Sequence, residues 1–215
     1  VSSQSLLKRL QLISGVISPN NALPILENFL FEIDNGKLTL KSTDLDCTME
    51  THIEIESNDN YSIAVDAKMI LEFLKAFPEQ PLTFLVDNEK NIIKVHSEDG
   101  EYSFTYFDGN EFPKTPVLSE EKKISLNSQT FLKSINQTIF AAGNDELRPV
   151  MSGVFCDISS GNINFVATDA HKLIRHKINE NCNETTSFII PKKPLNIIKN
   201  ISSESSQDIE ISYDK

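Results

Sequence analysis

Apolar residues near the start of the chain recur with the spacing of an amphipathic helix. They follow an i, i+4, i+7, i+11 pattern, so one face of this helix is expected to be buried. These positions are Leu6, Leu10, Ile13 and Ile17. Two strand-like stretches follow, Phe29 to Ile33 and Lys37 to Thr43, on either side of Asp34-Asn35-Gly36. Because Asn and Gly readily adopt positive φ, this segment predicts a hairpin turn.

The pattern continues with further short strands and a second helix. Asp66 is a good N-cap for a helix that runs through Phe77. Strands are expected near Met49 to Glu56, Tyr61 to Val65, Leu82 to Val86, Asn91 to His96 and Glu101 to Phe107. The segment from Glu111 to Pro116, which carries two prolines, then predicts a domain boundary.

The second half of the chain repeats the first half at a shift of 125 residues, with no net gap. Ser3 to Lys8 falls on Ser128 to Lys133, Thr43-Asp44 falls on Thr168-Asp169, and Lys68 falls on Lys193. Two such copies predict an α+β fold of tandem modules, each with two helices on one face and antiparallel sheets on the other. We expect domain 1 over residues 1–118 and domain 2 over residues 119–215, the second without the closing hairpin of the first.

Charge is distributed unevenly between the helices and the rest of the chain. The net charge is −11, whereas the four expected helices carry +6, so the remainder carries −17. A polar strip also repeats on the first helix of each copy: Gln4, Lys8 and Gln11 become Gln129, Lys133 and Asn136. Such segregation suits a protein that holds a polyanion against its helices. The alternative is that the lysines only keep the helix surfaces soluble.

Several classes of protein are not indicated by the sequence. Cys47, Cys156 and Cys182 show no CxxC spacing, and no phosphate-binding glycine loop, HExxH or GxSxG motif occurs. The start of the chain does not resemble a signal segment, and no apolar run approaches the roughly 18 residues that span a bilayer. We therefore expect a cytoplasmic, non-catalytic protein without a cofactor, a metal or a membrane partner.

Two groups of polar residues have both a functional and a structural interpretation. Asp169, His171 and His176 could bind a metal, but in an extended segment the two histidines would point to opposite faces because they are an odd number of residues apart. The repeated Thr-Asp pairs could be catalytic acids, but Thr-Asp at the end of a strand commonly caps a turn. The structural role is the expectation for both Thr-Asp pairs.

Four segments resemble the bacterial DNA polymerase III β sliding clamp family. They are Leu23-Pro24-Ile25-Leu26-Glu27-Asn28, Thr43-Asp44-Leu45, Phe112-Pro113 and, most specifically, the stretch from Val166 to Leu173. The resemblance implies three modules per chain, of which the third is absent here, and a head-to-tail homodimer that closes a ring around DNA. It implies as partners sequence-independent double-stranded DNA, the polymerase catalytic subunit, the clamp loader and other proteins with clamp-binding motifs. A secreted tandem-domain β-rich adhesion or binding module is the alternative.

The resemblance also assigns roles to individual residues. The expected DNA-facing set is Lys8, Arg9, Lys68, Lys75, Lys133, Lys192, Lys193 and Lys199. The expected pocket for partner peptides is formed by Arg148, Met151, Thr168, Ala170, His171, Lys172 and Leu173. The chain departs from the family pattern at Asn20, Asn144 and Asp145, and Ala170 replaces a common glycine. The resemblance further implies that Glu101 to Phe107 pairs across the subunit boundary.

Overall fold

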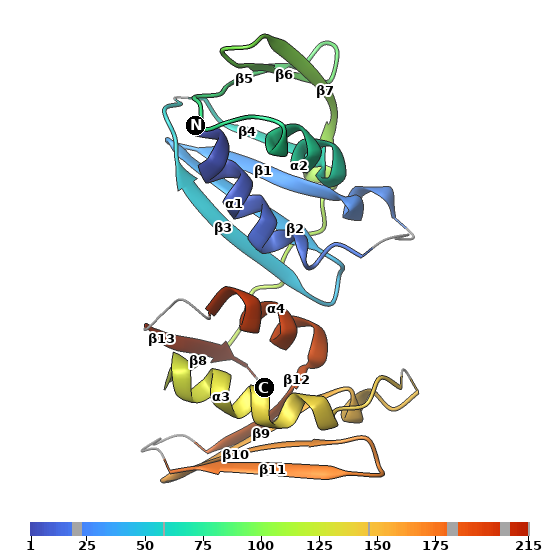
Figure 1. Cartoon of the computed structure of the whole chain (residues 1–215), viewed down its shortest axis with the longest axis vertical. Helices are drawn as coiled ribbons and strands as arrows, with labels where there is room; N and C mark the ends of the chain where they lie inside the picture. The colour runs from blue at the N-terminus through green and yellow to red at the C-terminus, as the bar shows by residue number, and fades with distance from the viewer. Residues whose placement is uncertain (19–22, 58, 146, 180–184, 203–206, 215) are drawn as a thin grey trace. The chain divides into compact units, whose positions relative to one another are not determined.

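A computed structural model describes residues 1–18, 23–57, 59–145, 147–179, 185–202 and 207–214 (Figure 1). The chain divides into two compact units, residues 1–115 and residues 116–215. Each unit combines two α-helices with antiparallel strands, so the expected α+β class is confirmed. The calls on Asn20 and Cys182 lie outside the described residues.

Unit 1 contains two helices and seven strands. The helices are α1 (Ser3–Ser14) and α2 (Ala67–Lys75), and a short 3-10 helix, η1 (Pro24–Glu27), precedes the first strand. The strands are β1 (Asn28–Asp34), β2 (Lys37–Thr43), β3 (Thr48–Glu54), β4 (Tyr61–Asp66), β5 (Thr83–Asp87), β6 (Ile92–His96) and β7 (Glu101–Asp108). Their order in the sheet is β3-β2-β1-β4-β7-β6-β5.

Local sequence signals explain where these elements begin and turn. The Ser2 hydroxyl accepts a hydrogen bond from the Ser5 N–H at the start of α1. The Asp66 carboxylate accepts one from the Met69 N–H at 2.7 Å, which confirms the predicted N-cap of α2. Between β1 and β2, Asn35 and Gly36 adopt φ of 47° and 80°, which confirms the predicted hairpin turn. The first helix ends at Ser14, three residues before the predicted Ile17.

Unit 2 contains helices α3 (Ser128–Thr138) and α4 (Lys192–Ser202). Two 3-10 helices, η3 (Ile139–Ala141) and η4 (Pro149–Met151), flank a loop after α3. The strands are β8 (Lys122–Asn127), β9 (Gly153–Ser159), β10 (Asn162–Thr168), β11 (Leu173–Ile178), β12 (Thr186–Pro191) and β13 (Asp208–Tyr213). They form one sheet of order β11-β10-β9-β12 and a separate pair, β13-β8.

The element boundaries bear out the internal repeat of 125 residues. Strands β1, β2 and β4 correspond residue for residue to β9, β10 and β12, and the pairing of Leu30 with Lys41 recurs as Phe155 with Val166. The expectation of a gap-free repeat is wrong after the second helix. Ser2 pairs with Pro81 in unit 1, whereas the repeat of Ser2, Asn127, pairs with Asp208, so unit 2 has two extra residues there.

Each unit has its own hydrophobic core between the helices and the strands. In unit 1 the side chains of Leu6, Leu10 and Ile13 on α1 are at most 1% exposed, and they pack with Phe29 and Leu40 of the sheet. In unit 2 Phe131 and Ile135 of α3 pack with Phe165, and the rings of Phe131 and Phe165 meet edge to face. Because each large apolar side chain buried contributes about 1.5–3 kcal/mol, these faces fix the helices on their sheets.

Candidate functional site

The polar strip of the first helices is exposed in both units. Lys8 and Gln11 on α1, and their repeats Lys133 and Asn136 on α3, face solvent on the side away from the buried apolar residues. Helix α1 packs beside α2, and α3 packs beside α4 (Figure 1). Each unit therefore presents a pair of neighbouring helices whose outer surface carries lysine and amide groups.

Most of the predicted DNA-facing lysines carry an ammonium group that forms no ion pair with the described residues. Lys68 and Lys75 on α2 are exposed, as are Lys8 and Lys133, and Lys199 is half-buried in the last turn of α4. Within the described part of the chain none of these five lysines forms an ion pair, since all the ion pairs there involve other residues. Ammonium groups that form no ion pair favour binding of phosphate.

Arg9 and Lys192 of the predicted DNA-facing set make side-chain hydrogen bonds to other parts of the fold. The Arg9 guanidinium lies 3.5 Å from the Thr51 hydroxyl of β3, so its side chain extends from α1 toward that strand. The Lys192 ammonium donates to the Asn144 side-chain oxygen at 2.9 Å and to the Ala142 carbonyl at 3.2 Å. Lys193 is half-buried beside it. The structure thus brings Lys192 to the loop after α3.

The predicted peptide-pocket residues from Thr168 to Leu173 form a tight turn between β10 and β11. The Thr168 hydroxyl donates to the Lys172 carbonyl at 2.8 Å and accepts the Ala170 N–H at 3.1 Å. One Asp169 carboxylate oxygen accepts the N–H groups of His171 and Lys172, and the other pairs with the Lys172 ammonium. Ala170 is held at φ 76°, a conformation that favours glycine.

The corresponding turn in unit 1 repeats the hydrogen bonds that the Thr hydroxyl and the Asp carboxylate make with the backbone. Thr43 bonds the Cys47 carbonyl and the Leu45 N–H, and Asp44 accepts the N–H groups of Asp46 and Cys47. Leu45, the repeat of Ala170, also has a positive φ of 80°. The predicted turn-capping role of both Thr-Asp pairs is therefore confirmed. His171 lies in the turn, so the prediction that it belongs to a strand with His176 was wrong.

A second segment brings Arg148 and Met151 to the same end of unit 2. The Gly143 N–H donates to the Met151 carbonyl at 2.8 Å, and a Cβ placed on Gly143 would lie 3.8 Å from Asp169. The Arg148 guanidinium pairs with Asp145 at 2.7 Å. The loop and the Thr168 turn thus meet at Gly143, which brings the two parts of the predicted pocket together.

Sequence reasoning missed the large apolar side chains that surround these segments. Leu147 is 92% exposed and Val150 66% exposed on the loop, and the predicted Leu173 is 63% exposed. Phe140 in η3 is also exposed. The signal in the sequence was the presence of Phe140, Leu147 and Val150 in a stretch otherwise rich in polar residues. Exposed apolar groups around polar backbone suit capture of an apolar peptide.

Two carboxylates at this end of unit 2 are held in their charged form. The Lys172 ammonium, together with the N–H groups of Lys172 and His171, lowers the pKa of Asp169 well below its ordinary value. The Arg148 guanidinium and the Leu147 N–H lower the pKa of Asp145. Both carboxylates are therefore negatively charged at neutral pH, and the charge of Asp145 is paired with the Arg148 guanidinium.

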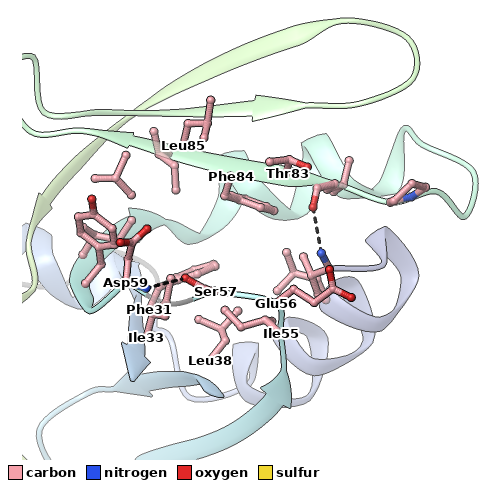
Figure 2. A pocket seen from close by; sticks show the side chains of 18 of the residues that line it. Phe31, Ile33, Leu38, Ile55, Glu56, Ser57, Asp59, Thr83, Phe84 and Leu85 are labelled. Atoms are coloured by element: carbon pink, nitrogen blue, oxygen red, sulfur yellow. Dashed lines mark hydrogen bonds between the residues drawn. The ribbon is translucent and has the colours of Figure 1, made fainter. Parts of the chain in front are cut away.

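A cavity of about 800 Å³ lies in unit 1, whereas the residues of the predicted pocket belong to unit 2. Figure 2 shows Phe84 of β5 opposite Phe31, Ile33 and Leu38 of β1 and β2. Exposed carboxylates of Glu54, Glu56 and Asp59 line one side. In unit 2 the corresponding place beside β13 is filled by β8, whose Ile124 and Leu126 are buried.

Within the described residues, no group of three His, Cys, Asp or Glu side chains could hold a metal ion. None of the helices described is long and apolar enough to cross a membrane. Cys156 is a free thiol, and burial raises its pKa to about 12, so this thiol stays protonated.

The paired helices and antiparallel sheets define a protein of the DNA polymerase sliding-clamp fold. The chain superimposes on the Bacillus subtilis sliding clamp with a TM-score of 0.92 at 22% identity, covering 100% of this chain and 59% of that one. The Caulobacter crescentus pol III beta structure gives a TM-score of 0.92 at 18% identity, covering 100% of this chain and 60% of that one.

The sequence identifies the family within this fold. Residues 1–116 match the N-terminal domain of the DNA polymerase III beta subunit, and residues 125–215 match its central domain. The chain therefore belongs to the DNA polymerase III beta subunit family, as the sequence predicted. This assignment favours the clamp over the alternative of a secreted adhesion module.

Curated relatives carry the same assignment over nearly the whole chain. The beta sliding clamp of Halalkalibacterium halodurans is 29% identical over 211 residues, which are 93% of this chain and 55% of that protein. That of Staphylococcus epidermidis is 28% identical over 206 residues, which are 92% of this chain and 54% of that protein. The chain thus spans about half the length of the curated relatives that it matches.

Proposed function

We propose that this chain forms the first two domains, residues 1–118 and 119–215, of a DNA polymerase processivity factor. In this function a non-catalytic ring encircles duplex DNA, slides along it and tethers polymerase and repair proteins. The observation that carries the proposal is the repeated, exposed lysine and amide strip on paired helices of a chain that belongs to the beta subunit family.

Electrostatics supports DNA as the partner of the helices. The helical stretches carry +6, although the whole chain carries −11. Lysines that contact phosphate oxygens carry no sequence information, so such contacts hold DNA in any register. The acidic remainder repels the polyanion from other surfaces. Together these properties suit a protein that guides DNA along its helices without a fixed binding site.

Ring closure requires a third module and a second copy, and β7 offers an edge for it. Glu101 to Thr105 pairs with β6, and Tyr106 to Asp108 pairs with β4 on the other side. In the described residues no strand pairs with Glu101 to Thr105 on the side away from β6. The expectation that this edge extends through Phe107 is wrong, because Phe107 pairs with Ala64. We propose Glu101 to Thr105 as the edge that meets the partner in a head-to-tail homodimer.

The tethering function is proposed for the end of unit 2 that carries Met151, Ala170 and Leu173. An exposed apolar surface with polar groups at its margin suits leucine and phenylalanine anchors of a short peptide. We propose as its ligands the clamp-binding motifs of the polymerase catalytic subunit, the clamp loader and other replication proteins. A protein with these partners works in the cytoplasm, at the replisome.

Charge reversal on the repeated strip tests the DNA-binding part of the proposal. Lys8→Glu combined with Lys133→Glu in the full-length polypeptide is expected to shorten retention on primed circular DNA several-fold. The effect is expected to be larger at low salt than at high salt, because screening weakens phosphate contacts. Retention is measured by gel filtration of clamps loaded on labelled DNA.

Lys177→Glu is the matched control, because Lys177 is equally exposed but lies on strand β11. It changes the net charge in the same direction and is expected to leave retention nearly unchanged. Unchanged retention of the double variant, or an equal loss per charge in the control, would contradict a DNA-binding role of the helical strip.

A further inference from the structure

Lys192 connects the second helix of unit 2 to the loop that carries part of the proposed pocket. It is the first residue of α4, and its backbone N–H donates to the Ser152 carbonyl at 3.0 Å. Its ammonium donates to Asn144 at 2.9 Å and to Ala142 at 3.2 Å. One residue therefore holds both ends of the segment between Ala142 and Ser152.

The segment that Lys192 holds includes one wall of the proposed peptide site. Met151 is tied back to Gly143 through the hydrogen bond of 2.8 Å, and the Ser152 hydroxyl donates to the Asp145 carbonyl at 3.2 Å. Since Gly143 also lies against Asp169, the position of Ala142 to Asn144 determines how Met151 faces the Thr168 turn. Lys192 thus acts at the junction of the two halves of the site.

The chemistry of the contact suits a structural anchor. The Lys192 side chain is half-buried, and with the described residues it forms no ion pair. Its charge is met by the carbonyl of Ala142, at the end of η3, where carbonyl groups lack helical partners. A cation at such a position is favourable, and its bonds are charge-assisted.

The internal repeat separates Lys192 from its neighbour. Lys193 corresponds to Lys68, so a lysine at this position of the second helix is shared by both units. Lys192 corresponds to Ala67, which is buried and has no group that could reach a loop. Lys192 is therefore a feature of unit 2, the unit that carries the proposed peptide site, and is not one of the lysines that repeat between the units.

We propose that Lys192 is a positioning residue for the peptide site, which holds the wall of Arg148 and Met151 against the Thr168 turn, and that it does not serve as a DNA contact. This inference rests on the proposed function of the site. It assigns the two adjacent lysines at the start of α4 to different tasks, Lys192 to the peptide site and Lys193 to DNA.

The test compares Lys192→Met, which keeps an unbranched side chain but removes the ammonium, with Lys193→Met. Binding of a synthetic peptide with leucine and phenylalanine anchors to the full-length polypeptide is measured by fluorescence anisotropy. We expect Lys192→Met to weaken binding about 5- to 10-fold, corresponding to roughly 1 kcal/mol or slightly more. Lys193→Met is expected to leave peptide affinity unchanged, and Lys192→Arg to restore most of it because guanidinium can donate to both oxygens.

Hydrogen exchange of backbone amides in the present chain gives a second readout that does not need the peptide. In Lys192→Met the Gly143 N–H is expected to exchange at least about tenfold faster, while the amides of β9 and β10 stay protected. An unaltered rate at Gly143 together with unaltered peptide affinity would overturn the inference. If the unchanged full-length polypeptide fails to bind the peptide, the proposed tethering function is itself wrong. If it binds and Lys193→Met weakens binding as much as Lys192→Met, only the role of Lys192 falls.

Discussion

Individual residues at the two Thr-Asp turns show how a strained backbone is held in place. Leu45 and Ala170 occupy the same position of the repeat, and both have positive φ. Such a conformation costs a residue with a Cβ about 1–2 kcal/mol. The cost is offset by the hydrogen bonds that neighbouring N–H groups donate to the Thr hydroxyl and the Asp carboxylate. The turn is therefore specified by its Thr and Asp, and tolerates side chains where glycine would be easier.

Ala170→Gly is expected to raise the free energy of unfolding of unit 2 by about 0.5–1 kcal/mol, because glycine removes the strain at φ 76°. Urea denaturation, followed by a probe in the unit that carries the substitution, measures this. Ala76→Gly is the control, since Ala76 ends α2 at φ −77°, where glycine relieves nothing and adds disorder to the unfolded chain. A loss of stability in both variants would show that the turn is not strained at Ala170.

At this scale the sequence predicted contacts within a few residues and missed contacts across the fold. The Asp66 cap, the Asn35-Gly36 turn and the Thr-Asp turns follow from local chemistry, and all are present. The bond from Lys192 to Asn144 spans 48 residues. Its existence depends on how α4 packs beside α3, which no local pattern encodes. The sequence alone therefore does not distinguish Lys192 from its neighbour Lys193.

At the scale of elements, the repeat allowed most helices and strands to be placed from the sequence. The strand from Lys37 to Thr43 was predicted with its observed bounds, and the other strands of unit 1 were located to within a few residues. The role of β8 could not be foreseen. Ile124 and Leu126 alternate with polar residues, but only the structure shows that β8 pairs with β13 and that both side chains are buried.

At the scale of the whole molecule, the account depends on the separation of charge between helices and strands. A chain with net charge −11 binds a polyanion only if its lysines are gathered on one surface. The sequence predicted the gathering on helices, and the structure adds that Lys8 and Lys133 are exposed and form no ion pair with described residues. Holding DNA by enclosure needs little intrinsic affinity, which agrees with so modest a basic surface.

Enclosure is tested most directly by the topology of the DNA. The full-length polypeptide is loaded by its clamp loader onto nicked circular DNA, isolated by gel filtration, and the DNA is then cut once with a restriction enzyme. The account predicts that the protein stays with the circle and is released when the circle becomes linear, because a ring slides off free ends. Equal retention on circular and linear DNA, or no retention on the circle, would contradict it.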